Sequence, residues 1–121
     1  PSNPIVSIGP IVALPGIGEA LASRRVDVVA VSPIVNGSAL KGPAERMLRE
    51  LGHESSVIGV ARLYRDFAAT LVVDTADADL ASDVEAEGMT CVVTPTVMTD
   101  LNVATELCRT ILSPQSRLKV R

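Results

Sequence analysis

Two polar loops contain the residues whose types and spacing could bind an anionic ligand. The first loop, residues 1–10, places Ser2, Asn3 and Ser7 at a predicted helix start. A helix N-terminus presents unpaired N–H groups and about half a positive charge, so a phosphate could bind there with the hydroxyl and amide groups as further donors. Ordinary N-capping by the same residues is the alternative, because Ser, Asn and Pro also favour turns and caps.

The second loop, residues 32–43, joins a predicted strand to a predicted helix. Its twelve residues exceed the usual length of such a connection, which is about two to six residues, and long loops of this kind are often functional. Lys41 stands just before the helix start, where a cation is unfavourable unless an anion lies between the two. Anion contact is therefore one interpretation of Lys41, and exposure to solvent is the other.

The acidic residues after the second predicted strand do not match a calcium loop. Counting from Asp77 puts Ala81 at the fifth position and Ser82 where an EF-hand needs glycine. Helix capping explains Asp77 and Asp79 instead, and His53, the only histidine, is interpreted as a residue at a helix end. No nucleophile is paired with a base, so the catalytic residues stay unassigned and no metal ligands are predicted in this chain.

Composition favours an α/β fold. Hydrophobic residues make up 47% of the 121 residues and aromatic residues only 2%. The core must then consist of Val, Leu, Ile and Ala, as in a parallel sheet covered by helices. A chain of this length corresponds to one domain that buries roughly two-thirds of its unfolded surface.

The net charge and the cysteine spacing limit which binding partners and which cellular compartment we expect. The net charge of −3 and the pI near 5.0 exclude nucleic acid as an expected partner. Cys91 and Cys108 match no metal or disulfide spacing, which indicates free thiols and a cytoplasmic location. Gly and Pro interrupt the apolar residues 5–21, so no membrane span is predicted.

Helix-length segments separate the predicted strands. Strands are predicted at residues 26–31, 69–74 and 89–94, and helices at residues 6–14, 15–21, 44–51, 57–64, 80–87 and from residue 100 to Pro114. We expect Pro43 at the first position of its helix, Ser55 as a helix cap, and Gly52 and Gly88 as helix stops.

These connections require parallel crossovers. The predicted fold is a Rossmann-like three-layer sandwich with a mainly parallel sheet. Because a loop of the opening type normally follows a strand, we expect residues 1–121 to be the C-terminal portion of one such domain. Ligands bind outside the carboxyl ends of the strands, so the functional rim is predicted at residues 1–7, 32–41, 74–77 and 94–100.

Five sequence blocks resemble the C-terminal part of the 2-phospho-L-lactate transferase family. They are PSNP and SIGPI in the opening loop, PGI at residues 15–17, VAVSPIV at 29–35 and ALKGPA at 39–44. Bacterial members of this family are phosphoenolpyruvate transferases of coenzyme F-420 biosynthesis. The family's glycine-rich segment contains Asn36 here in place of a glycine, and Asn tolerates left-handed backbone better than most residues.

The resemblance implies transfer of a phospholactyl or phosphoenolpyruvyl group from a GDP-activated donor to the deazaflavin Fo, with release of GMP. It also implies Mg2+, with ligands expected before Pro1, and a homodimer. Residue by residue, the binding positions carried over are Ser2, Asn3, Pro4 and Ser7 for guanosine diphosphate, and Ser32, Pro33, Lys41 and Gly42 beside the donor or the deazaflavin.

Alternatives remain open at this stage. A non-enzymatic nucleotide-sugar-binding regulator of the gluconeogenesis-factor-like group shares the fold and a similar first loop. The second loop resembles the transferases more, so the transferase is the main hypothesis, and the isolated chain is expected to be inactive. The donor stays open between phospholactate and phosphoenolpyruvate, although a composition rich in Ala and Arg and poor in Lys favours a bacterial source.

Overall fold

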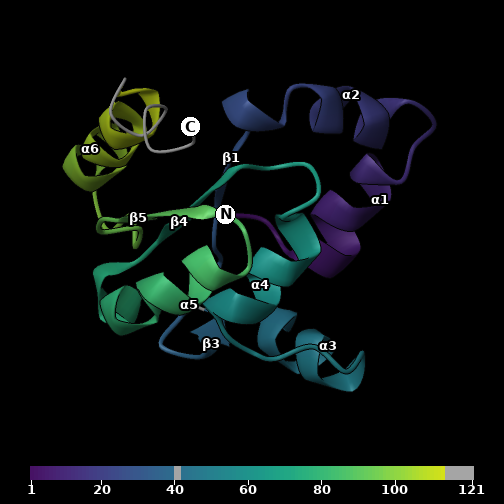
Figure 1. The fold of residues 1–121 in the computed structure, drawn as a ribbon. Helices are drawn as coiled ribbons and strands as arrows, with labels where there is room; N and C mark the ends of the chain where they lie inside the picture. Colours follow the sequence, from purple (N-terminus) through teal and green to yellow (C-terminus); the bar gives the residue numbers. More distant parts are fainter. Residues whose placement is uncertain (40–41, 114–121) are drawn as a thin grey trace.

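A computed structural model describes residues 1–39 and 42–113 of the chain (Figure 1). Its centre is a three-stranded parallel sheet in the order β1-β4-β5, made of β1 (Val29–Val31), β4 (Thr70–Val73) and β5 (Thr90–Val93). With helices around this sheet, the fold is Rossmann-like α/β, as the sequence predicts. Because all three strands run in parallel, their carboxyl ends share one edge.

Helical segments cover the sheet. They are η1 (Pro4–Ile8), α1 (Gly9–Val12), α2 (Ile17–Ser23), η2 (Arg25–Asp27), α3 (Ala44–Glu50), α4 (Val57–Tyr64), η3 (Thr75–Leu80), α5 (Ala81–Ala86) and α6 (Leu101–Leu112). In Figure 1, α4 and α5 lie below the sheet and α6 lies above it. The helices predicted from apolar spacing are therefore present, with ends shifted by a few residues.

The core is aliphatic and centred on β4, whose four residues are all buried. Leu71 and Val73 project into a cluster that includes Leu48 of α3 and Val60 of α4. Tyr64 closes this cluster, and burial raises the pKa of its hydroxyl to about 12. The core matches the composition-based expectation of Val, Leu, Ile and Ala packing.

The prediction that strand 26–31 is covered on both faces was wrong. Residues Arg25–Asp27 form a 3-10 turn, Val26 is 59% exposed, and the three residues of β1 are only half-buried. Among the described residues β1 pairs with β4 alone, so it is an edge strand. A groove of about 250 Å³ runs along this open edge, lined by Ser2, Ile8, Val28, Val29, Ala30, Val31, Tyr64 and Phe67.

A short β-hairpin occupies the predicted loop at residues 32–43. Its strands are β2 (Ile34–Val35) and β3 (Ser38–Ala39), paired antiparallel. Asn36 and Gly37 form the turn with φ of 56° and 80°, which are the two positive dihedrals of a type I′ turn. The expected left-handed backbone of Asn36 is thus confirmed, whereas the hairpin itself was not predicted.

Three predicted helix starts need correction. Ser56, not Ser55, caps α4 by accepting the Ile58 N–H. Asp74, not Asp77 or Asp79, caps the segment after β4, because a 3-10 turn begins directly after the strand and the first carboxylate faces its free N–H groups. Pro43 occupies the cap position of α3 and not its first helical position.

The predicted helix stops are confirmed. Gly52 and Gly88 have φ of 82° and 94°, the left-handed conformation that commonly ends a helix.

The two cysteines lie in different surroundings. Cys91 on β5 is buried, whereas Cys108 on α6 is exposed.

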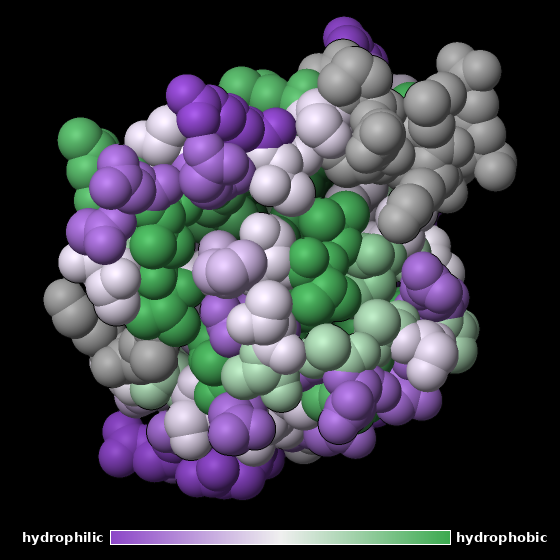
Figure 2. Space-filling model, turned by 90° about the vertical axis from the view of Figure 1, so that its left-hand side faces the viewer, coloured by the Kyte–Doolittle hydropathy of each residue, from purple (hydrophilic) through white to green (hydrophobic). Residues whose placement is uncertain are grey.

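Apolar side chains are also exposed around α6. Met98, Leu101 and Leu112 are at least half-exposed, and Figure 2 shows apolar surface between polar margins on the side of the molecule that carries α6.

No single helix within residues 1–39 and 42–113 has the length and apolarity needed to cross a membrane. The helical pair Pro4–Val12 and Ile17–Ser23, bent by 87°, meets that test only jointly, and by length and composition alone.

Candidate functional site

The candidate site is the carboxyl edge of the sheet, where three loops leave the strands. Ser32 follows β1 and donates its N–H to the Val72 carbonyl at 2.9 Å, while Thr94 follows β5 and donates to the Val73 carbonyl at 3.1 Å. Both neighbouring loops therefore start beside the end of β4. Open α/β sheets bind ligands at such an edge, and three of the four predicted rim segments begin here.

Asp74 is the central polar residue of this edge. Its carboxylate accepts the Thr96 N–H at 2.8 Å, the Thr96 hydroxyl at 3.3 Å and the Ala76 N–H at 2.9 Å. Burial raises the pKa of Asp74, but the hydrogen bonds from Thr96, Ala76 and Val97 outweigh burial and lower that pKa below its ordinary value of 3.8. Asp74 is therefore an ionised anchor for the loop after β5.

Asp77 is a second buried carboxylate on the same turn. It is 5% exposed, and its Oδ2 accepts the Asn36 N–H of the hairpin turn at 3.0 Å. This role was not predicted. The Asn-Gly dipeptide after the apolar pair Ile34-Val35 is a hairpin signal that could have revealed the turn, but no local pattern links Asn36 to Asp77, 41 positions away.

The opening loop forms a helix cap. Asn3 accepts the N–H groups of Ile5 and Val6 through its Oδ1, at 2.8 and 3.2 Å, and its main-chain carbonyl accepts the Ser7 N–H. The capping interpretation is confirmed. A phosphate at this helix start would have to displace the Asn3 carboxamide, so phosphate binding by the loop stays a prediction.

The remaining predicted residues of this loop differ in exposure. Ser2 is exposed and lines the groove beside β1, Pro4 is buried, and Ser7 is half-buried. The Nδ2 of Asn3 lies 3.7 Å from the Met47 sulfur, which brings the loop beside α3.

The predicted residues of the second loop also have distinct surroundings. Ser32 is buried, and its hydroxyl accepts the Ile34 N–H at 3.1 Å and lies 3.3 Å from the Ile34 carbonyl, to which it donates. Pro33 is half-buried inside this turn. Gly42 is exposed with a φ of 78°. Lys41 lies outside the described residues.

A shallow basic hollow opens at the start of α3. Its volume is about 540 Å³, and it is lined by Gly42, Pro43, Glu45, Arg46 and Arg49. Arg46 also pairs with Glu50 at 3.5 Å, but this exposed ion pair contributes little, so the guanidinium remains available to a stronger anion. Neither arginine was predicted as a binding residue, because basic residues on a helix usually indicate a solvated face.

A second hollow borders the end of β5. Its volume is about 230 Å³, and its lining comes from the rim segment after β5 and the first two turns of α6, namely Thr94, Pro95, Asn102, Val103 and Glu106.

The described residues offer no metal cage. Within residues 1–39 and 42–113, no three side chains of the His, Cys, Asp or Glu type are grouped so that they could hold a metal ion. The described side chains therefore do not fit the implied Mg2+.

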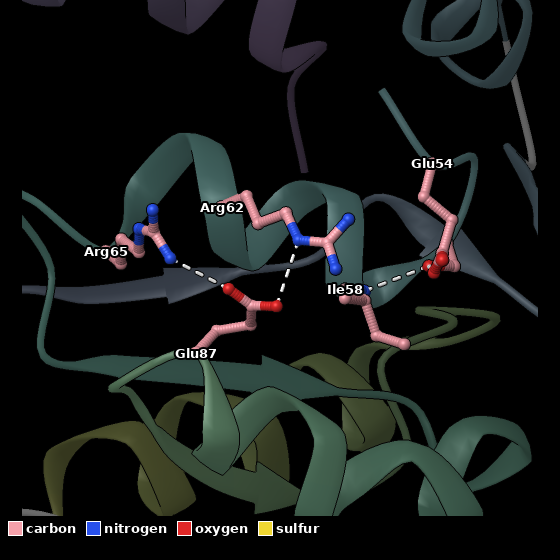
Figure 3. A network of polar contacts seen from close by, with 6 residues as sticks. Glu54, Ile58, Arg62, Arg65 and Glu87 are labelled. Carbon is pink, nitrogen blue, oxygen red and sulfur yellow. Dashed lines mark hydrogen bonds and ion pairs between the residues drawn. The ribbon is translucent and has the colours of Figure 1, made fainter. Parts of the chain in front are cut away.

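One polar network lies away from this edge. Glu87, after α5, accepts from Arg62 at 2.9 Å and from Arg65 at 2.8 Å, both on or next to α4 (Figure 3). Arg25 in turn donates to the Arg65 and Gly88 carbonyls. The network joins α4 to the segment entering β5, which is the amino end of the sheet, and we interpret it as structural.

The parallel sheet, with helices around it and loops anchored at its carboxyl edge, defines an α/β domain of the Rossmann-like class. The chain belongs to the family described as 2-phospho-L-lactate transferase CofD, whose model matches residues 1–114. This family is the one that the sequence blocks resemble.

Individual relatives carry two different names. The phosphoenolpyruvate transferase of Kitasatospora aureofaciens is 43% identical over 114 residues, which cover 93% of this chain and 36% of the relative. The 2-phospho-L-lactate transferase of Methanocaldococcus jannaschii is 40% identical over 112 residues, covering 93% and 34%. That of Halobacterium salinarum is 44% identical over 106 residues, covering 88% and 27%. The chain thus spans about a third of these relatives' length, and its identity to relatives with either name is similar.

Proposed function

We propose that the protein containing this chain transfers a 2-phospho-L-lactyl or phosphoenolpyruvyl group from a GDP-activated donor to the deazaflavin Fo. The donor is lactyl- or enolpyruvyl-diphospho-guanosine, the other product is GMP, and the reaction belongs to coenzyme F-420 biosynthesis. The observation that carries the proposal is the family match over residues 1–114.

The chemistry is a displacement at phosphorus. An Fo hydroxyl oxygen forms a bond to the phosphorus that bears the lactyl or enolpyruvyl group, and the bond from that phosphorus to the bridging oxygen breaks. GMP leaves with the electron pair, and the hydroxyl proton is released. Such a reaction depends mainly on positioning and on neutralising phosphate charge.

The basic hollow at α3 supports this proposal electrostatically. Arg46 and Arg49 line it, and Gly42, a position carried over from the family resemblance, forms part of the same lining. Guanidinium groups bind phosphate oxygens through planar, charge-assisted hydrogen bonds. We assign the donor's diphosphate to this hollow. Lys41 is a further candidate cation by resemblance to the family alone.

Magnesium, the homodimer and the cytoplasmic location belong to the same proposal. When bound, Mg2+ would neutralise the diphosphate and the GMP leaving group. By resemblance to the family, we expect its ligands from a part of the whole protein outside residues 1–121.

The test is a mass-spectrometric assay of the whole protein with Fo, each guanosine-activated donor and magnesium. Appearance of GMP together with the donor-extended deazaflavin would establish the transferase and name its donor. If neither donor gave product while guanine or uridine nucleotides still raised the melting temperature, the nucleotide-binding regulator would replace the enzyme. The isolated 121-residue chain is expected to give no product.

A further inference from the structure

The turn after β4 holds both neighbouring loops through two buried carboxylates. Asp74 and Asp77 are 7% and 5% exposed. Asp74 points to the loop after β5, where it accepts both the N–H and the hydroxyl of Thr96. Asp77 points the other way, to the N–H of Asn36 in the hairpin after β1. One turn on the central strand therefore connects three loops of the candidate site.

The hairpin depends on outside contacts for its position. Each of its strands has two residues, which is too short for independent stability in water. Ile34 fixes its base, because that side chain is fully buried in the core. The turn residue Asn36 is exposed, so its side chain does not anchor the tip. The hydrogen bond from the main-chain N–H of Asn36 to Asp77 anchors the tip.

A buried carboxylate can hold the hairpin turn, although removing its charge from water costs free energy. Burying a charged group is unfavourable unless hydrogen bonds compensate it, and a bond to an ionised acceptor is shorter and stronger than a neutral one. An apolar residue at position 77 could fill the same space but could not orient the turn. The orientation matters because β3 of this hairpin contacts α3, whose side chains line the basic hollow.

We propose that Asp77 is a positioning residue of the transferase, which holds hairpin β2–β3 against α3 in the arrangement that binds the donor. Asp74 has the corresponding role for the loop after β5. The inference rests on the proposed function. Asp74 and Asp77 lie on the predicted rim, but no part in positioning the neighbouring loops was predicted for either residue.

The experiment compares variants of the whole protein in the transferase assay. In Asp77→Ala the KM for the guanosine-activated donor should rise about tenfold while kcat changes less than about threefold, the pattern of lost binding rather than lost chemistry. Asp77→Asn keeps an oxygen that can accept the Asn36 N–H, and should return KM to within about threefold of the wild type. The matched control is Asp79→Ala, at an exposed position of the same η3 segment, and its kinetics should equal the wild type.

The possible outcomes separate three cases. An Asp77→Ala protein with a lower melting temperature but wild-type KM would overturn the inference, because Asp77 would then be structural only. If Asp77→Ala did not fold, Asp77→Glu would decide: its charge is kept but displaced by one methylene, and an unchanged KM would overturn the inference. A wild-type protein without turnover of either donor would instead overturn the proposed function, and this inference with it.

Discussion

At the residue scale, Asp74 links loop structure to protonation state. Replacing Asp74 with Asn puts an NH2 group against a main-chain N–H donor, because both carboxylate oxygens accept hydrogen bonds. We expect Asp74→Asn to lower the free energy of unfolding by about 1–3 kcal/mol, the typical cost of a buried unsatisfied polar group. Urea denaturation of the whole protein measures this, with the exposed Asp66→Asn as the control.

Asp74 also makes the folding stability of the wild-type protein depend on pH. Because the folded-state pKa of Asp74 lies below its ordinary value of 3.8, its stabilisation is complete above that pH. It is lost as the pH falls below 3.8 and through the folded-state pKa. The Asp74→Asn protein should lack this component of the acid dependence. Parallel acid profiles for the two proteins would show that Asp74 titrates normally.

A second prediction at this scale concerns Asn3, whose helix-capping role can be separated by experiment from a role in binding guanosine diphosphate. Asn3→Ala removes the oxygen that accepts the Ile5 and Val6 N–H groups, so unfolding should become about 1 kcal/mol easier. Asn3→Asp keeps a capping oxygen and should retain most of the stability. Calorimetry with guanosine diphosphate then tests the ligand role: equal affinity of Asn3→Ala and wild type would leave capping alone.

At the element scale, Gly59 shows how closely α4 packs against the chain that precedes it. A Cβ on Gly59 would lie 1.9 Å from the Glu54 carbonyl oxygen, so Gly59→Ala must displace backbone. We expect a loss of about 1–3 kcal/mol or more in the free energy of unfolding, despite the better helix propensity of Ala.

The control for Gly59 is Gly18→Ala in α2, where the nearest atom would be 3.1 Å away. Its thermal unfolding should change much less. Equal melting temperatures for Gly59→Ala and wild type would mean that α4 can move away from Glu54.

Which elements could be predicted from sequence depends on the range of the interactions that form them. The buried β4 and the helix stop Gly88 follow from local patterns of branched apolar residues and glycine, and both were predicted. The exposure of β1 was not predictable, because the run at residues 26–31 looks the same whether a neighbouring strand covers it or not.

In the candidate site too, features formed by local sequence were predictable and those formed by long-range contacts were not. The loops of the rim follow from strand order, and the Asn3 cap from residue type. The bond from Asn36 to Asp77 joins segments 41 positions apart, and the hollow at α3 requires Arg46 and Arg49 to face the same side as Gly42. Neither arrangement produces a repeating pattern of residues that could be recognised in the sequence.

At the scale of the whole molecule, the open edge of β1 predicts association of the isolated 121-residue chain. The edge of β1 opposite β4 has no strand paired to it among the described residues, and the adjoining groove is largely apolar. Such an edge is a template for pairing with another chain. Sedimentation velocity over a concentration series should show oligomers that grow with concentration.

A charge on that edge should suppress the association. Val29→Lys places a cation on β1, whereas Val26→Lys, at an exposed position in η2, is the matched control. The control should associate like the wild type. A wild-type chain that stays monomeric at every concentration would contradict the prediction.

The two cysteine side chains give this molecule a built-in reporter of its own opening. A thiol-specific reagent can reach Cys108 on the surface of α6 in the folded state, whereas Cys91 on β5 is buried and reacts only when its strand becomes exposed. The fast reaction of Cys108 therefore gives the amount of protein, and the slow reaction of Cys91 gives the rate at which β5 becomes exposed. Ligands that bind the carboxyl edge of the sheet should slow only the second reaction, so binding can be followed without a label or an assay of turnover.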